Sequence, residues 1–255
     1  DRPQFIAAAA AIAAQSCGAP VKLVLERDQD MQITGQRHEF LVRYRVAHSA
    51  DGAVEAIDAQ LYNNGGFRGD LSPAVVEVAL FAIDNAYHLP ATRFVGHCCR
   101  TNRPSCTAYR GFGKPQGVAA IESIMDHVAR SCRMAAVDVR QRNLLRAGQE
   151  LVDGEVVDDC LDKCWQPLLK LYRERRPGVD RFNAENRFRK RGLALTPAKN
   201  NMGFETDWMN QAGALIHVYG DGSVHVSHSG CEMGQGLNTK IAQVAADELG
   251  VPISL

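Results

Sequence analysis

Residues 39–66 read EFLVRYRVAHSADGAVEAIDAQLYNNGG and contain two runs in which apolar and polar side chains alternate. The runs meet at Asp51 and Gly52, a pair that accepts the positive φ angles of a tight hairpin turn. Because the alternation repeats every two residues, one face of each strand points toward a core. The stretch therefore predicts a long antiparallel hairpin over residues 39–63.

Helices are predicted on both sides of this hairpin. Residues 4–17 are rich in alanine, the strongest helix former, and Gly18 and Pro20 end that segment. The stretch KPQGVAAIESIMDHVARSC (114–132) carries apolar residues at helical spacing, and AAVDVRQRNLL (135–145) follows as a second helix.

The remaining elements give an α+β fold of two lobes, residues 1–150 and residues 151–255, each mixing strand hairpins with covering helices. We expect a buried strand at 21–27, a loop at 63–73, strands at 91–100 and 191–199, a polar helical connector over 146–190, a hairpin around Asp221-Gly222 within 213–230, and a last helix from about 237 to 249.

The balance of charges argues against a function that depends on a strong net charge over the whole surface. The chain has 255 residues with 29 basic and 29 acidic side chains, so its net charge is zero and no nucleic acid or anionic membrane is expected as a partner. The apolar run from Phe5 to Ala14 is too short to span a bilayer, which needs roughly 20 residues. The basic run from Arg187 to Arg191 is interpreted as an exposed helix end rather than a phosphate site.

Cysteines and histidines give no metal-binding pattern. The eight cysteines are irregularly spaced and include no C-x-x-C pair, which favours reduced thiols in a cytoplasmic protein. The histidines are scattered, and His225 and His228 lie three apart on a predicted strand, where their side chains face opposite sides.

Two glycine-rich loops that precede helices are the candidates for chemistry. They are TAYRGFGKPQG (107–117) and HSGCEMGQG (228–236). Such junctions bind anions through unpaired backbone N–H groups and the helix dipole, although the spacing alone fits simple tight turns equally well. Arg110 and Gln235 add hydrogen-bond donors, and Phe112 can present a flat face to a planar ligand.

These two loops carry a resemblance to a known family. CRTNRPSCTAYRGFGKPQG (99–117) resembles the TNLPSNTAFRGFG-PQ motif of the xanthine dehydrogenase and aldehyde oxidase family, and HSGCEMGQGLNTKIAQV (228–244) resembles its HGG-EMGQG-HTKM-QV motif. Residues 21–40, 182–195 and 210–224 are also similar to family segments, so the likeness covers nearly the whole chain.

The resemblance implies an internal portion of a molybdopterin-binding domain, in which the protein supplies no direct ligand to molybdenum. It implies that Arg110 lies near the molybdenum through its main chain and that Gln235 makes a hydrogen bond beside it. Phe112 would stack on an aromatic substrate. The residues implied to bind the cofactor are Arg110, Gly111, Met233, Gly234 and Gln235.

The resemblance also implies the reaction and the missing parts. The family hydroxylates small molecules with oxygen from water, using a general-base glutamate that we expect beyond Leu255, and a cofactor loop FGGKE is expected before Asp1. Electrons would leave through two 2Fe-2S clusters and FAD, on further domains or subunits of a homodimer. The chain begins with Asp rather than Met, and we expect a piece of a longer protein that is inactive alone.

One position bears on the substrate. In the xanthine dehydrogenase branch an arginine precedes the segment ALFHMDN, whereas EVALFAIDN (77–85) places Val78 there. An apolar residue cannot hydrogen-bond a purine oxygen, so Val78 favours aldehydes and N-heterocycles as substrates. A purine-oxidising xanthine dehydrogenase is the alternative. A non-catalytic scaffold is a further alternative, against which the intact RGFG and EMGQG sequences argue.

Overall fold

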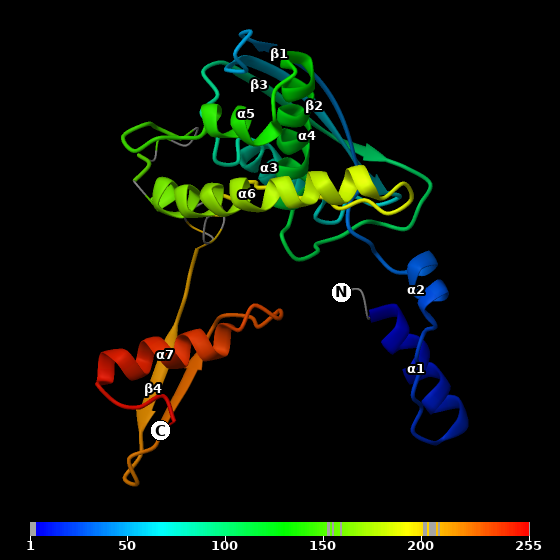
Figure 1. The fold of residues 1–255 in the computed structure, drawn as a ribbon. Helices are drawn as coiled ribbons and strands as arrows, with labels where there is room; N and C mark the ends of the chain where they lie inside the picture. The colour runs from blue at the N-terminus through cyan, green and yellow to red at the C-terminus, as the bar shows by residue number, and fades with distance from the viewer. Residues whose placement is uncertain are drawn as a thin grey trace. The chain divides into compact units, whose positions relative to one another are not determined.

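A computed structural model describes residues 4–151, 154, 156–158, 160–200, 203, 208 and 210–254. It divides into two compact units, Asp1–Asn200 and Asn201–Leu255, and each is described by itself. The elements of the first unit are α1 (Gln4–Cys17), α2 (Arg27–Ile33), β1 (Phe40–His48), β2 (Val54–Gly66), α3 (Ser72–Ala82), β3 (Thr92–Arg100), α4 (Lys114–Cys132), α5 (Ala136–Asn143) and α6 (Cys160–Glu185), as Figure 1 shows. Those of the second unit are β4 (Ala214–Val218), β5 (Val224–His228) and α7 (Leu237–Leu249).

A three-stranded sheet in the order β1-β2-β3 forms the centre of the first unit. β1 and β2 pair antiparallel, with Phe40 opposite Asn63, and the N–H of Gly52 donates to the carbonyl of Ser49 at 3.1 Å in the connecting turn. The predicted hairpin is therefore confirmed. β3 pairs parallel with β2, and α3 lies in the connection between them, because parallel neighbours need a crossover rather than a tight turn.

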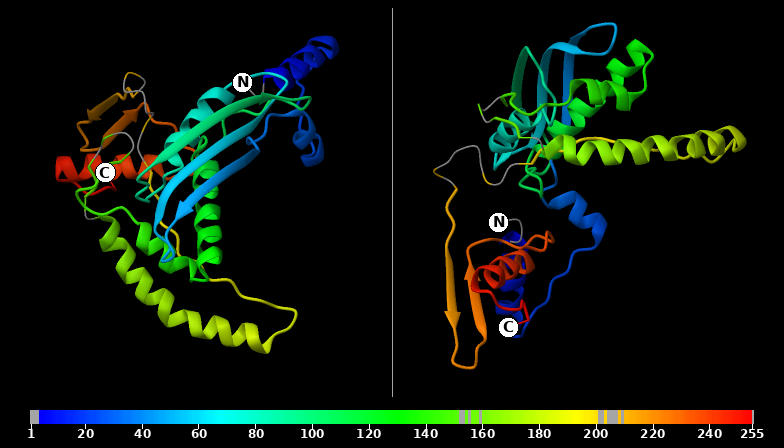
Figure 2. Two further views of the ribbon diagram at one scale, coloured as in Figure 1. Left: turned by 90° about the horizontal axis from the view of Figure 1, so that it is seen from above. Right: turned by 60° about the vertical axis from the view of Figure 1, so that its left-hand side comes forward.

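The core lies between this sheet and the helices α3 and α4, which cover one of its faces (Figure 2). Buried side chains alternate along β2, and Leu61 is completely buried. From α4, Ile121, Ile124 and Met125 are also completely buried against it. Each such side chain contributes roughly 1.5–3 kcal/mol on burial, so the sheet and α4 form one rigid support.

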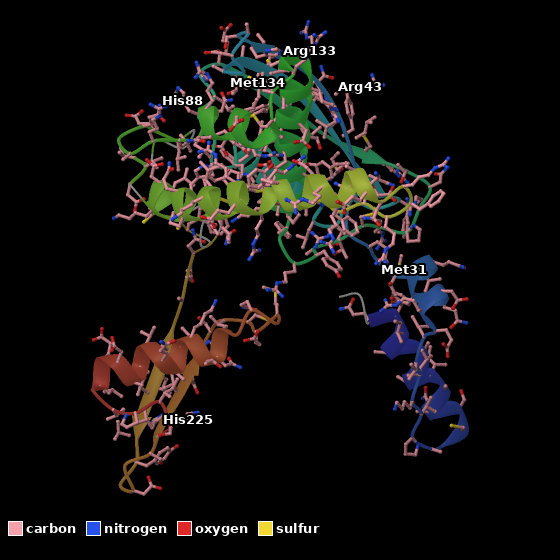
Figure 3. The ribbon with its side chains drawn as sticks, in the orientation of Figure 1. Met31, Arg43, His88, Arg133, Met134 and His225 are labelled. Carbon is pink, nitrogen blue, oxygen red and sulfur yellow. The ribbon has the colours of Figure 1, made fainter. Side chains whose placement is uncertain are left out.

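The helix α4 begins and ends where the sequence predicts. Pro115 lies in its first turn, where the missing N–H costs nothing. After Cys132 the backbone of Arg133 turns left-handed with φ 56°, and its N–H reaches the carbonyls of Ala129 and Arg130. Figure 3 shows Arg133 and Met134 at this end of α4.

Three predictions on local structure are wrong. Residues 21–27 form no strand because no neighbouring strand pairs with them; Val24 is 71% exposed, and Glu26 with Gln29 forms a capping box that starts α2. Residues 191–199 likewise have no strand partner. The loop expected at 63–73 is shorter, since β2 runs to Gly66 and α3 begins at Ser72.

The second unit is a small hairpin followed by a helix. β4 and β5 pair antiparallel with Ala214 opposite His228, and the turn between them contains Gly222 at φ 88°. α7 follows a glycine loop, as predicted, and ends at Gly250 in the left-handed region. The mixture of helices and small sheets confirms the α+β class.

Two observations concern the chain as a whole. No disulfide bond joins any of the eight cysteines, all of which lie among the described residues. Among the described residues, no helix has both the length and the apolar character required to cross a membrane.

Candidate functional site

The first glycine loop has an unusual backbone. Gly111, Phe112 and Gly113 have φ angles of 97°, 44° and 95°, so three residues in a row lie in the left-handed region. Two turn bonds close the loop, from the N–H of Phe112 to the carbonyl of Tyr109 at 2.8 Å and from the N–H of Lys114 to the carbonyl of Gly111 at 2.9 Å. A left-handed Phe is uncommon, and such strain is characteristic of binding sites.

Close packing on α3 holds this loop in place. A Cβ added at Gly113 would collide with the carbonyl oxygen of Val75 and lie 2.9 Å from the backbone nitrogen of Ala79. A Cβ at Gly117 would lie 2.5 Å from the carbonyl oxygen of Ala79. Both glycines therefore allow a backbone approach that no other residue permits. Val78 belongs to the same helix and is 9% exposed.

Arg37 supports the loop from the other side, and the sequence interpretation missed it. Its Nη2 donates to the carbonyl oxygen of Arg110 at 2.7 Å. Its guanidinium lies 4.2 Å from the ring centroid of Tyr109, a cation–π arrangement. The only sequence signal was its place in ITGQRHEF (33–40), a segment that the family resemblance included without giving it a role.

Polar atoms beside this loop remain without hydrogen-bond partners in the structure. Arg37 Nη1 and the amide oxygen of Gln116 are buried and unpaired, and so is the amide oxygen of Asn63. Neighbouring groups are satisfied, since Gln116 Nε2 donates to the carbonyl of His38 at 3.1 Å and His38 Nε2 lies 2.7 Å from Ser72 Oγ. Because buried polar groups are almost always paired, an unpaired donor beside this loop fits a polar ligand there.

In the second glycine loop, backbone N–H groups bind a carboxylate that belongs to the loop itself. The carboxylate of Glu232 accepts hydrogen bonds from the backbone N–H groups of Gly234 at 2.6 Å, Gly236 at 3.1 Å and Asn238 at 3.4 Å. Desolvation raises the pKa of Glu232, but these N–H groups outweigh it and hold the pKa below its ordinary value. Two N–H groups before α7 and one in its first turn thus converge on one negatively charged group.

Gln235 lies inside this second loop. Its Oε1 accepts from the N–H of Met233 at 2.6 Å, and its Nε2 donates to the carbonyl of Cys231 at 2.8 Å. Met233 is 58% exposed, so its side chain does not pack in a hydrophobic core. His228 Nε2 lies 3.1 Å from Asn238 Oδ1, at the entry to α7.

The structure places the predicted site residues in two groups. Arg110, Gly111 and Phe112 share the first loop, next to the helix of Val78. Met233, Gly234 and Gln235 share the second loop, in the second unit.

The two histidines of β5 lie on opposite faces of the strand. His225 and His228 alternate between exposed and half-buried along β5, and Figure 3 shows His225 on this strand. Within the described ranges, no group of three His, Cys, Asp or Glu side chains is arranged to hold a metal ion.

Comparison with protein families gives two matches, which are separated by residues 145–168. Residues 2–144 match the model of a molybdopterin cofactor-binding domain, and residues 169–255 match a second model with the same description.

Known proteins match over nearly the whole chain. It is 47% identical over 255 residues to a xanthine dehydrogenase of Drosophila subobscura, and the aligned region covers 98% of this chain and 19% of that protein. It is 43% identical over 257 residues to aldehyde oxidase 3 of Mus musculus, covering 100% of this chain and 19% of that protein. The chain thus spans about a fifth of the length of these relatives.

Solved structures share the fold at low sequence identity. The aldehyde oxidoreductase from Desulfovibrio gigas matches with a TM-score of 0.70 and 22% identity, over 93% of this chain and 26% of that one. Quinoline 2-oxidoreductase from Pseudomonas putida 86 matches with a TM-score of 0.64 and 20% identity, over 95% of this chain and 33% of that one.

Proposed function

Because the chain belongs to the family of molybdopterin cofactor-binding domains, we propose that it is an internal part of a molybdenum hydroxylase and binds the anionic molybdopterin cofactor. One observation supports this proposal: two backbone N–H groups of the second loop and one in the first turn of α7 already bind the carboxylate of Glu232. A phosphate or other anionic oxygen of a cofactor needs the same donors. We place the first cofactor-binding subdomain in residues 1–150, and a connector with the start of the second in residues 151–255.

The two loops have separate roles in this proposal. In the first loop, Arg110 and Gly111 present main-chain groups to the cofactor close to the metal, and Arg37 fixes the carbonyl of Arg110. In the second loop, Met233, Gly234 and Gln235 bind the cofactor, with the Gln235 amide beside the metal. Bound molybdenum supplies the two-electron redox centre. The chain's own contribution is to bind and orient.

The rest of the reaction belongs to parts of the protein outside this chain. We propose a general-base glutamate, two 2Fe-2S clusters and FAD in further domains or subunits, and a homodimeric assembly in the cytoplasm. The eight cysteines, none of which forms a disulfide, fit a reducing compartment.

Phe112 and Val78 are the proposed substrate contacts. Phe112 is half-buried and has a left-handed backbone, and its flat ring suits stacking on a planar substrate. Val78 offers no hydrogen bond, so we propose aldehydes and N-heterocycles as substrates. Purine oxidation is the second candidate, because the xanthine dehydrogenase of Drosophila subobscura is 47% identical to this chain.

Molybdenum analysis of the complete protein tests the cofactor proposal. After expression with sufficient cofactor, we expect stoichiometric molybdenum in the wild type and a clear loss in Arg37→Met, which removes the donor that holds the carbonyl of Arg110, and in Gln235→Leu. Arg130→Met, an exposed position near the end of α4, is the matched control and should keep the metal. A folded wild type without molybdenum would instead establish the non-catalytic scaffold.

Substrate choice requires a second measurement on the loaded protein. Val78→Arg should raise the ratio of kcat/KM for xanthine to that for an aldehyde, because a guanidinium replaces an apolar contact. Phe112→Ala should raise KM for aromatic substrates with the molybdenum content unchanged. An unaltered xanthine-to-aldehyde ratio would remove Val78 from the residues that set specificity.

A further inference from the structure

The segment that leaves the first unit is irregular but firmly held. Residues 191–200 form no helix or strand, yet Pro197 is buried. The carbonyl of Pro197 accepts from Asn85 Nδ2 at 3.0 Å, and the N–H of Lys199 donates to Asn85 Oδ1 at 2.9 Å. The amide side chain of Asn85 therefore makes two hydrogen bonds to the backbone of this segment, where a neighbouring strand would otherwise supply the partners.

A buried ion pair reinforces this contact. Lys199 Nζ lies 2.7 Å from Asp84 Oδ1 and 2.8 Å from Asp84 Oδ2. The Asp84 side chain is 4% exposed and that of Lys199 is 25% exposed. A carboxylate this deeply buried needs a compensating charge, and Lys199 supplies it from more than a hundred residues away in the sequence.

The turn that holds the segment is itself fixed in the core. Asn85 follows α3, is completely buried and has a φ of 48°. Its Nδ2 also donates to Glu122 Oε1 at 3.0 Å, and the hydroxyl of Tyr87 donates to the same oxygen at 2.7 Å. Arg140 Nε lies 2.6 Å from Glu122 Oε2. The turn is therefore joined to both α4 and α5.

The same elements carry the first glycine loop. Lys114, the first residue of α4 and the residue after Gly113, donates from Nζ to Asn200 Oδ1 at 3.2 Å. Gly113 and Gly117 pack on α3, whose end carries Asp84 and Asn85. The glycine loop and the exit of the chain are thus attached to one pair of helices.

We propose that Asp84, Asn85 and Lys199 form a linker anchor, which fixes the point where the chain leaves the first unit and thereby holds the first glycine loop in the shape that retains the cofactor. Asp84 and Lys199 are positioning residues, since they act through the linker. The retention part of this inference rests on the proposed function, whereas the anchoring part rests on the hydrogen bonds alone.

The experiment uses the complete protein with two readouts, which are backbone hydrogen exchange at residues 193–200 and molybdenum per protein. In Lys199→Met we expect exchange to speed up at least tenfold at Lys199 and its neighbours, and molybdenum to fall by more than half. Lys199→Arg should preserve both values because it keeps the positive charge. Lys170→Met, at an exposed position of α6, is the matched control and should change neither.

A double variant separates anchoring from folding. Asp84→Asn with Lys199→Met leaves no unpaired buried charge, so the first unit should keep its melting temperature while exchange still speeds up and molybdenum still falls. Unchanged exchange in this variant refutes the anchor. Faster exchange with full molybdenum refutes its role in cofactor retention. A wild type without molybdenum refutes the proposed function, and exchange then still decides the anchor.

Discussion

The close approach of the first glycine loop to α3 can be measured with three alanine substitutions. Gly113→Ala combines a positive φ with a collision against the backbone of Val75. Gly148→Ala has the same sign of φ, at 85°, with no atom within 4 Å of the new Cβ. Gly117→Ala introduces a Cβ 2.5 Å from the carbonyl oxygen of Ala79 inside a helix. Together they separate backbone strain from steric collision.

The expected magnitudes follow from these geometries. A left-handed Cβ costs about 1–2 kcal/mol, and the stiffer unfolded chain returns about 0.4–1 kcal/mol, so Gly148→Ala should lower the free energy of unfolding by about 1 kcal/mol. Overpacking adds about 1–3 kcal/mol, and for Gly117→Ala the better helix propensity of alanine offsets about 1 kcal/mol of it. Gly113→Ala should therefore cost about 2–4 kcal/mol, the largest loss of the three.

Urea unfolding followed by tryptophan fluorescence provides the assay. The chain has two tryptophans, and Trp165 is 3% exposed in the core of the first unit, whereas Trp208 is 70% exposed. A Trp208→Phe background leaves Trp165 as the reporter of the first unit. The reasoning is wrong if Gly113→Ala and Gly148→Ala unfold at the same urea concentration, because the collision with α3 would then contribute nothing.

Two further predictions concern charge. Because the pKa of Glu232 is lowered, its hydrogen bonds to the second loop stabilise the fold above pH 4.5, and this stabilisation is lost as the pH falls through the lowered pKa. The amide NMR shifts of Gly234 and Gly236 should titrate in that range. Amide shifts that do not change with pH would contradict these hydrogen bonds. Arg140→Met should lower the free energy of unfolding by about 3–5 kcal/mol, because it leaves the largely buried carboxylate of Glu122 without its positive partner. Arg142→Met removes an exposed ion pair with Asp51 and should lower it by less than about 1 kcal/mol in the same experiment.

Regular periodicity made the main elements predictable. The hairpin around Asp51-Gly52 and the helix over 114–132 follow from local patterns that tertiary contacts reinforce. α3 was not predicted, because SPAVVEVALFA is apolar on nearly all sides and has no period that separates helix from strand. Residues 21–27 have the composition of a strand, but a strand also needs a partner, and the sequence does not show one.

The site was predictable only where it is contiguous in sequence. Both glycine loops, with Arg110 and Gln235, stand out from their own residues and from the family resemblance. Arg37 supports Arg110 from 73 positions away, and Lys199 pairs with Asp84 across 115. No local pattern encodes such contacts, because they exist only once α3, α4 and the linker have packed together.

The carboxylate of Glu232 has a consequence for any ligand of the second loop. An incoming anion must displace a side chain that is tethered only a few atoms from the same N–H groups. The measured binding free energy is therefore the difference between the interactions of two anions that compete for one set of N–H donors. The loop keeps its shape when the ligand leaves, because the carboxylate of Glu232 then accepts the same hydrogen bonds.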